Sequence, residues 1–210
     1  MQRSTVCAAL LALLIASATS HGVAAEGGAE PPFRFYTVLD GLTQSEAYDI
    51  EQDRAGYLWF TTARGLNRFD GSNFDNFTIA DGLPNNELTA LHAIGSNSIW
   101  VGDVRGNITA LRGDRVVDVI DIDSERDAAI SDIEYFGQRI LAVAEGHGVF
   151  QVVAEDGEYH SERIGGEGAG ITNLVVYGTE VWAVASSGLY EMTFGTDPKL
   201  ELRDADIRHL

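Results

Sequence analysis

The sequence predicts an all-β fold built from a repeated unit of four short strands. The first observation is a fixed period of 41 residues: Trp100 follows Trp59 after one period, and Trp182 follows Trp100 after two. The second is that the turn glycines Gly65 and Gly106 keep the same spacing as the first two tryptophans. The third is that short apolar runs between these markers are bounded by Gly, Asn or Asp, as strands are. A four-stranded unit of this length is typical of a β-propeller blade.

Residues 1–25 are predicted to be a secretory signal peptide. Arg3 precedes the apolar stretch 6–16, and small residues follow as far as Ala25. This stretch is shorter than the roughly 20 residues that span a bilayer. We therefore expect a periplasmic or secreted protein, with a short linker over residues 26–32. Cys7, the one cysteine of the sequence, lies inside the leader, so the remaining chain would contain no disulfide.

The propeller is predicted to cover residues 33–210 in units of approximately 40–80, 81–122, 123–164 and 165–205. In the second unit, strands are expected at 88–93, 98–102, 107–111 and 116–120. The runs 140–144 and 181–185 are apolar at every position, which indicates strands covered on both faces. Blades packed face to face provide that cover. A parallel β-helix is the alternative, but its shorter coils fit the glycine-bounded hairpins poorly.

The two ends of this region predict about four blades and an incomplete ring. Residues 33–39 match the last strand of a unit, because "FRFYTVLDGL" resembles "FDNFTIADGL" one repeat later. Residues 204–210 resemble the first strand of a further unit. An interrupted ring has open sheet edges and end faces, so we expect possible self-association through them.

The charge of the chain argues against nucleic acid as a partner. Its 32 acidic and 14 basic residues give a net charge of −18, and loss of Arg3 with the leader makes the remaining chain more negative by one charge. Such a surface repels phosphate backbones.

Two segments resemble a known family of repeats. Residues 40–78, "DGLTQSEAYDIEQDRAGYLWFTTARGLNRFDGSNFDNFT", and residues 81–111, "DGLPNNELTALHAIGSNSIWVGDVRGNITAL", are similar to two-component regulator propeller repeats. The resemblance implies an extracytoplasmic sensor module of a histidine kinase, a diguanylate cyclase or a related signalling protein. Any kinase or cyclase activity would then lie in an output domain beyond residue 210. The alternatives are a propeller enzyme acting on glycans and a protein-interaction scaffold.

The topology of a propeller predicts a ligand-binding face. The loop into the first strand of each blade and the turn between its second and third strands open on the same face, around the channel. Arg64 and Arg105 occupy equivalent turns and offer planar sets of donors to an anion or a saccharide. The alternative is that both are solvated or paired with acids. The candidate ligand-binding residues are Gln44, Ser45, Arg64, Asn85, Asn86, Arg105 and His147.

The sequence predicts no catalytic site, no metal site and no cofactor. It contains no G-x-S-x-G or H-E-x-x-H motif, and its five histidines are scattered. Asp53 lies three residues before Gly56 and six before Trp59, so its carboxylate is expected to hold a hairpin turn. Trp59 is expected to pack between blades.

Overall fold

The computed structural model describes residues 33–122, 127–194 and 201–204. The chain divides into residues 1–35 and residues 36–210, and the strands that the structure describes lie in the second unit. The predicted signal peptide and residues 205–210, where a further strand was expected, lie outside the described residues. None of the described helices is long and apolar enough to cross a membrane.

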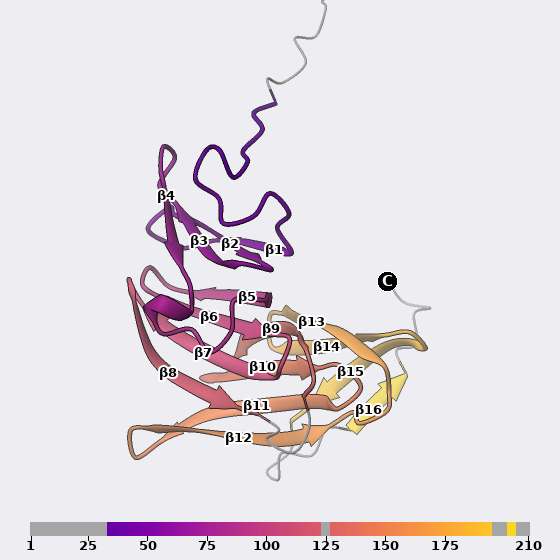
Figure 1. The fold of residues 1–210 in the computed structure, drawn as a ribbon. Coiled ribbons are helices and arrows are strands. Elements are labelled where there is room, and N and C mark those ends of the chain that lie inside the picture. Colours follow the sequence, from indigo (N-terminus) through magenta and orange to yellow (C-terminus); the bar gives the residue numbers. More distant parts are fainter. Residues whose placement is uncertain (1–32, 123–126, 195–200, 205–210) are drawn as a thin grey trace, which may run out of the picture. The chain divides into compact units, whose positions relative to one another are not determined.

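The strands form four sheets, each made of four consecutive antiparallel strands (Figure 1). Within each sheet the strand order follows the sequence, as in the blades of a propeller. The first sheet contains β1 (Asp49–Gln52), β2 (Leu58–Thr62), β3 (Gly65–Phe69) and β4 (Phe74–Phe77). The second contains β5 (Leu88–Ile94), β6 (Ser98–Asp103), β7 (Asn107–Arg112) and β8 (Arg115–Asp121). The third contains β9 (Ile130–Phe136), β10 (Arg139–Ala144), β11 (Gly148–Glu155) and β12 (Glu158–Gly165). The fourth contains β13 (Ile171–Tyr177), β14 (Glu180–Ala185), β15 (Gly188–Thr193) and β16 (Glu201–Asp204).

Hydrophobic clusters fill the spaces between consecutive sheets. Trp59 of β2 packs with Leu88 and Ile99 of the second sheet. Trp100 of β6 belongs to the cluster that joins the second sheet to the third, and Leu141 of β10 to the cluster that joins the third to the fourth. β10 is therefore covered on both faces, as its uninterrupted apolar run predicted. This packing confirms a propeller of four-stranded blades. β14 is buried only on the face of Val181 and Ala183, and Trp182 on its other face is partly exposed, so the same prediction for 181–185 was wrong for that face.

Side chains of the first strands also bind the backbone of the following sheet. The Thr89 hydroxyl of β5 donates to the Ile130 carbonyl at 2.6 Å, and the Ser131 hydroxyl of β9 donates to the Thr172 carbonyl at 2.8 Å. Both donors lie at register shifts of their strands, where a bulge turns the side chain out of the regular alternation. Hydrogen bonds are directional, so these two fix how neighbouring sheets are placed along each other, which hydrophobic packing alone does less strictly.

The turn between β1 and β2 has the structure that the sequence predicts. Asp53 is buried, and its Oδ1 accepts backbone N–H groups from Ala55 at 2.8 Å and Tyr57 at 3.1 Å. Its Oδ2 accepts the indole N–H of Trp59 at 3.0 Å. One carboxylate thus closes the hairpin and fixes the tryptophan that packs against the next blade.

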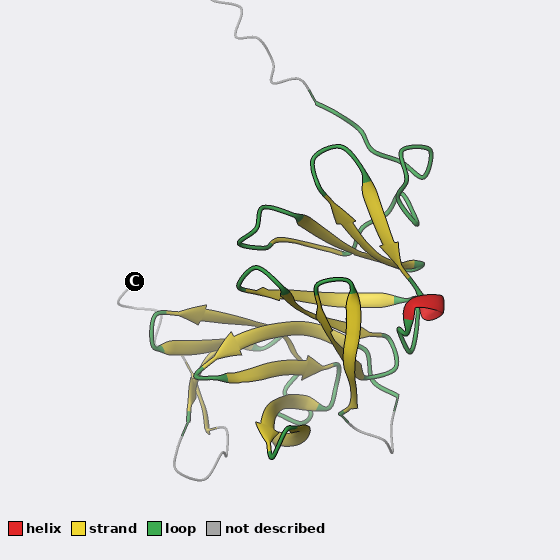
Figure 2. Cartoon of the chain, turned by 90° about the vertical axis from the view of Figure 1, so that its left-hand side faces the viewer, coloured by secondary structure: helices red, strands yellow, loops and turns green. Residues whose placement is uncertain are grey.

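The segment 33–39 does not form the fourth strand that its sequence similarity predicted. It is irregular and leads into a turn at residues 38–41, and none of the described strands pairs with it. A fourth strand needs a third strand beside it to satisfy its backbone groups, and β1–β4 already form a complete sheet. The helix η1 (Ile79–Asp81), which the sequence analysis did not predict, joins β4 to β5 (Figure 2).

Candidate functional site

Backbone hydrogen bonds join the two kinds of loop that the sequence analysis placed on one face. The loop before the first strand of each sheet lies against the turn between the second and third strands. In the first sheet Tyr48 donates to Thr61 near the end of β2 at 2.9 Å, and in the second the turn residue Val104 donates to Glu87 of the loop at 3.2 Å. Corresponding bonds occur in the third and fourth sheets, from Glu145 to Ala129 at 2.9 Å and from Ser186 to Gly170 at 3.2 Å. We call this set of loops and turns the turn face.

Buried polar side chains fix the turn face in the first sheet. The Asn67 side chain is wholly buried, accepts the backbone N–H of Thr43 at 2.8 Å and donates to the Thr43 hydroxyl at 2.9 Å. The Thr62 hydroxyl lies 2.9 Å from that of Thr43, donates to the Gly65 carbonyl and accepts the backbone N–H of Arg64 at 3.0 Å. The backbone from which the Arg64 side chain projects is therefore held in place.

Gly65 ends this turn for a steric reason. Its φ is +136°, which side-chain-bearing residues rarely adopt, and a Cβ atom there would lie 2.5 Å from the carbonyl oxygen of Phe77. The close approach of β4 to the turn therefore requires glycine at this position. Gly106, one repeat later, shares the positive φ, at +89°.

An aspartate performs the same task in the second sheet. Asp103 stands one repeat after Thr62 and is buried. Its Oδ1 accepts the backbone N–H groups of Arg105 at 2.8 Å and Asn107 at 3.0 Å, and its Oδ2 accepts from the Asn107 amide at 2.8 Å. Both arginines thus project from turns whose backbones are held by hydrogen bonds to a buried side chain, Thr62 in the first sheet and Asp103 in the second.

The guanidinium groups of Arg64 and Arg105 are exposed and make no hydrogen bond or ion pair within the described part of the fold. Neither Arg64 nor Arg105 has a side-chain hydrogen bond or ion pair with another described residue, so pairing with nearby acids is not seen there. The Gln44 Oε1 atom, in the loop before β1, is buried and has no hydrogen-bond partner among the described residues. A buried acceptor without a partner is uncommon in proteins, where such groups bind protein, water or ligand atoms.

The remaining predicted residues differ in their roles. Ser45 is exposed, and His147 is half-buried in the turn between β10 and β11. Asn85 and Asn86 hold their own loop: Asn85 Oδ1 accepts from the Glu87 backbone at 3.1 Å, and Asn86 Oδ1 accepts from the Ile79 backbone at 2.9 Å. Ligand binding by any of the seven residues stays a prediction.

A second polar group, which the sequence analysis missed, lies on the first strands of three sheets. Glu51, His92 and Glu134 each stand opposite the second-strand residue that packs between blades, in register with Trp59, Trp100 and Leu141 respectively. We call them the His92 row. The sequence contained one signal for this group, because the three residues follow one another at the repeat spacing to within one position. The sequence analysis looked for identical residues at that spacing and therefore missed a set that mixes glutamate and histidine.

The His92 row connects the three sheets electrostatically. His92 Nδ1 lies 3.3 Å from Glu51 Oε1 and 3.9 Å from Glu134 Oε2. Burial alone would lower the pKa of His92, but the hydrogen bond and charge of Glu51, with the charges of Glu134 and Asp132, outweigh it and raise the pKa. Burial also raises the pKa of Glu134, and the charges of Asp132 and Glu51 add to this effect while His92 opposes it.

The carboxylates of the His92 row are placed for contacts between sheets. In the described ranges no three His, Cys, Asp or Glu side chains converge as metal ligands do. The carboxylates are instead used between sheets: Glu51 accepts the backbone N–H of Ala93, and Asp49 accepts that of Leu91 at 2.9 Å. These residues therefore hold neighbouring blades together.

Comparison with known proteins finds one short stretch of sequence similarity and several solved structures with the same fold. No known protein-family profile matches the sequence. A 42-residue stretch is 55% identical to "Histidine kinase P4" of Formosa agariphila, covering 20% of this chain and 3% of that protein. The extracellular domain of a protein described as a hybrid two-component system from B. thetaiotaomicron aligns with a TM-score of 0.64 and 17% identity, over 82% of this chain and 26% of the other.

A lyase shares the same architecture. A catalytically inactive virginiamycin B lyase from Staphylococcus aureus, crystallised with quinupristin, aligns with a TM-score of 0.61 and 16% identity over 80% of this chain and 58% of the other. At these identities the structural likenesses show the fold alone. The four stacked sheets and these comparisons lead to one conclusion: the chain is a β-propeller that resembles the extracellular domains of two-component signalling proteins.

Proposed function

We propose that the chain is the extracytoplasmic sensor part of a signal-transduction protein and binds a small polar ligand on its turn face. The support for the signalling role is the likeness to a histidine kinase and to extracellular domains of two-component systems. The chain spans only a small part of those proteins, so the output that it would control is a proposal too. In this role the chain carries no catalytic centre, and it lies in the periplasm or outside the cell.

The observation that carries the ligand proposal is the combination of unused donors and an unused acceptor on one face. Arg64 and Arg105 project from pinned turns at equivalent positions of adjacent sheets, and Gln44 supplies a buried oxygen that lacks a partner among the described residues. Guanidinium groups bind carboxylates and other anions through paired, charge-assisted hydrogen bonds. An amide oxygen accepts a hydrogen bond from a hydroxyl group. Together they suit an acidic saccharide, which presents both groups, better than a neutral sugar or a simple anion.

The net charge of −18 is consistent with this choice of a small ligand. A nucleic acid or another extended polyanion would meet repulsion over most of the surface, whereas a single acidic sugar meets only the groups that surround it. We therefore propose no nucleic-acid partner for this segment.

A thermal-shift screen of the full chain tests the proposal. The probes are inorganic phosphate, sulfate, glucuronic acid, galacturonic acid and glucose, each added over a series of concentrations. A ligand that binds only the folded state raises the Tm as its concentration increases. We expect the uronic acids to raise the Tm more than glucose or sulfate. A Tm that none of the probes changes would contradict the ligand proposal, while the sensor proposal would then depend on a larger partner.

A further inference from the structure

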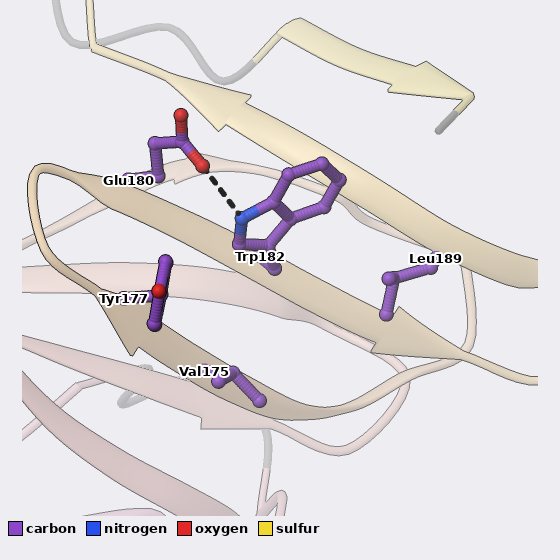
Figure 3. Close-up of a pocket in the computed structure, with 5 residues that line it drawn as sticks. All are labelled: Val175, Tyr177, Glu180, Trp182 and Leu189. Carbon is purple, nitrogen blue, oxygen red and sulfur yellow. Dashed lines mark hydrogen bonds between the residues drawn. The ribbon is translucent and has the colours of Figure 1, made fainter. Parts of the chain in front are cut away.

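One face of the fourth sheet exposes apolar side chains whose equivalents in the other three sheets are buried. The second-strand residues Trp59, Trp100 and Leu141 are 2%, 4% and 0% exposed because the following sheet covers them. Trp182 occupies the equivalent position of β14, opposite Val175, yet it is only partly buried. Figure 3 shows that Trp182 lines a hollow with Val175, Tyr177, Glu180 and Leu189. We call this surface the Trp182 face.

The chemistry of the Trp182 face is that of a contact between blades. Its tyrosine, Tyr177, is 77% exposed, and Val175 is 47% exposed. The indole N–H of Trp182 donates to Glu180 Oε2 at 3.2 Å, much as the indole of Trp59 donates to Asp53. The polar atom of the ring is thus satisfied at the rim, and the apolar ring surface is left toward solvent. An exposed set of large apolar side chains is typical of an interaction surface.

Polar side chains beside this face predict what binds there. Asp49 and Asp132 each accept a backbone N–H from the first strand of the following sheet, that of Leu91 and that of Leu174 respectively. Asn173 stands at the equivalent position of β13 and is exposed. The Thr172 hydroxyl likewise corresponds to those of Thr89 and Ser131, which donate to carbonyls of the following sheet. The face therefore offers a β-strand backbone the same kinds of acceptor and hydroxyl that join the other blades.

The complementary surface is present on the first sheet of the same chain. Ile50 of β1 stands opposite Phe60, as Leu91 stands opposite Val101 and Leu174 opposite Ala183. Leu91 and Leu174 are 2% and 3% exposed because the preceding sheet covers them, whereas Ile50 is 56% exposed. We call the surface around Ile50, with Leu58 and Phe60 of β2, the Ile50 face.

We propose that the Trp182 face binds the Ile50 face of a second copy of this chain, so that copies associate head to tail. The contact repeats between molecules the packing that the structure shows between consecutive sheets. Within one copy the backbone N–H of Ile50 donates to Asp49 Oδ1 at 2.8 Å, and in the contact it donates to Asn173 of the neighbouring copy instead. This bond corresponds to those that Asp49 and Asp132 accept from Leu91 and Leu174 within the chain. Because the two surfaces differ, the contact is heterologous and leaves one face of each kind free at the ends of an assembly.

Two charge-introducing variants test the contact, measured by sedimentation velocity over a range of concentrations of the full chain. We expect the wild type to associate increasingly with concentration. Trp182→Arg removes one face and Ile50→Arg the other, so each variant alone should be monomeric. An equimolar mixture of the two should form a dimer and nothing larger, because each variant retains the face that the other has lost.

A third variant controls for the introduced charge. Val119→Arg alters an exposed apolar residue of β8, on neither face, and should associate as the wild type does. Circular dichroism of each variant verifies that it is folded. A wild type that stays monomeric at all concentrations would overturn the proposal, and so would a mixture that fails to form a dimer from folded variants. If another part of the same chain occupied the Trp182 face, the wild type would also be monomeric, and the proposal would be wrong.

Discussion

The replacement Asp53→Ala tests how one buried carboxylate supports a blade. The side chain accepts three hydrogen bonds, from two backbone N–H groups of the turn and from the Trp59 indole. Trp59 is 2% exposed, so its N–H would stay unpaired, which costs about 1–3 kcal/mol. Ala55 and Tyr57 are both exposed, so water replaces those bonds at a smaller cost of roughly 0.5 kcal/mol each. We expect a total loss of about 2–4 kcal/mol.

Urea unfolding followed by tryptophan fluorescence measures this loss. The matched control is Asp70→Ala, because Asp70 also accepts two backbone N–H groups in a hairpin turn, from Ser72 and Asn73, but is exposed and binds no indole. Its loss should be clearly smaller. The double variant Asp53→Ala/Trp59→Phe isolates the indole bond, since the two losses should not add. Equal losses for Asp53→Ala and Asp70→Ala would refute the role of the buried carboxylate.

Three further predictions follow from the turns and the contacts between sheets. Gly65→Ala should destabilise the fold by about 2–4 kcal/mol through strain and a clash with the Phe77 carbonyl, while Gly71→Ala, with a φ of +98° but open space around it, should cost less in the same urea titration. Thr89→Val should cost about 1 kcal/mol by removing the bond to Ile130, and Thr172→Val, whose hydroxyl binds within its own sheet at 3.3 Å, should cost less; equal costs would argue against the contact between sheets. The raised pKa of His92 means that its stabilising charge is complete below its ordinary value of 6.5 and is lost as the pH rises through the raised value, so unfolding free energy should fall across that window. His92→Gln should flatten this slope, and a wild-type stability that rises with pH there would contradict the arrangement of Glu51, Glu134, Asp132 and Asp49 around the ring.

Much of the fold was predictable because each blade repeats the same local requirements. The strand expected at 98–102 became β6 with one residue more, and the apolar run at 181–185 became β14 with one residue more. Asp53 and Trp59 took the roles that their spacing indicated, since a turn carboxylate and a neighbouring strand are fixed by local geometry. Local chemistry of this kind can be read from one unit of the repeat.

Features that depend on two sheets at once were not predictable in the same way. The bond from Thr89 to Ile130 and the contacts of His92 with Glu51 and Glu134 require the first strands of neighbouring sheets to lie side by side. Nothing in a single unit specifies those partners. The segment 33–39 failed for the same reason: its sequence resembles β4, but strand formation needs a neighbouring strand as well as a suitable sequence.

Isothermal titration calorimetry of the most effective ligand from the screen tests the central claim most directly. The wild type is compared with the double variant Arg64→Ala/Arg105→Ala and with Arg115→Ala, which removes an exposed arginine at the start of β8, at the opposite end of its sheet. A charge-assisted hydrogen bond contributes about 1.5–3 kcal/mol, so loss of both arginines should weaken binding roughly a hundredfold or more. The account predicts that weakening in the double variant and an unchanged Kd in Arg115→Ala. An unchanged Kd in a folded double variant would contradict it.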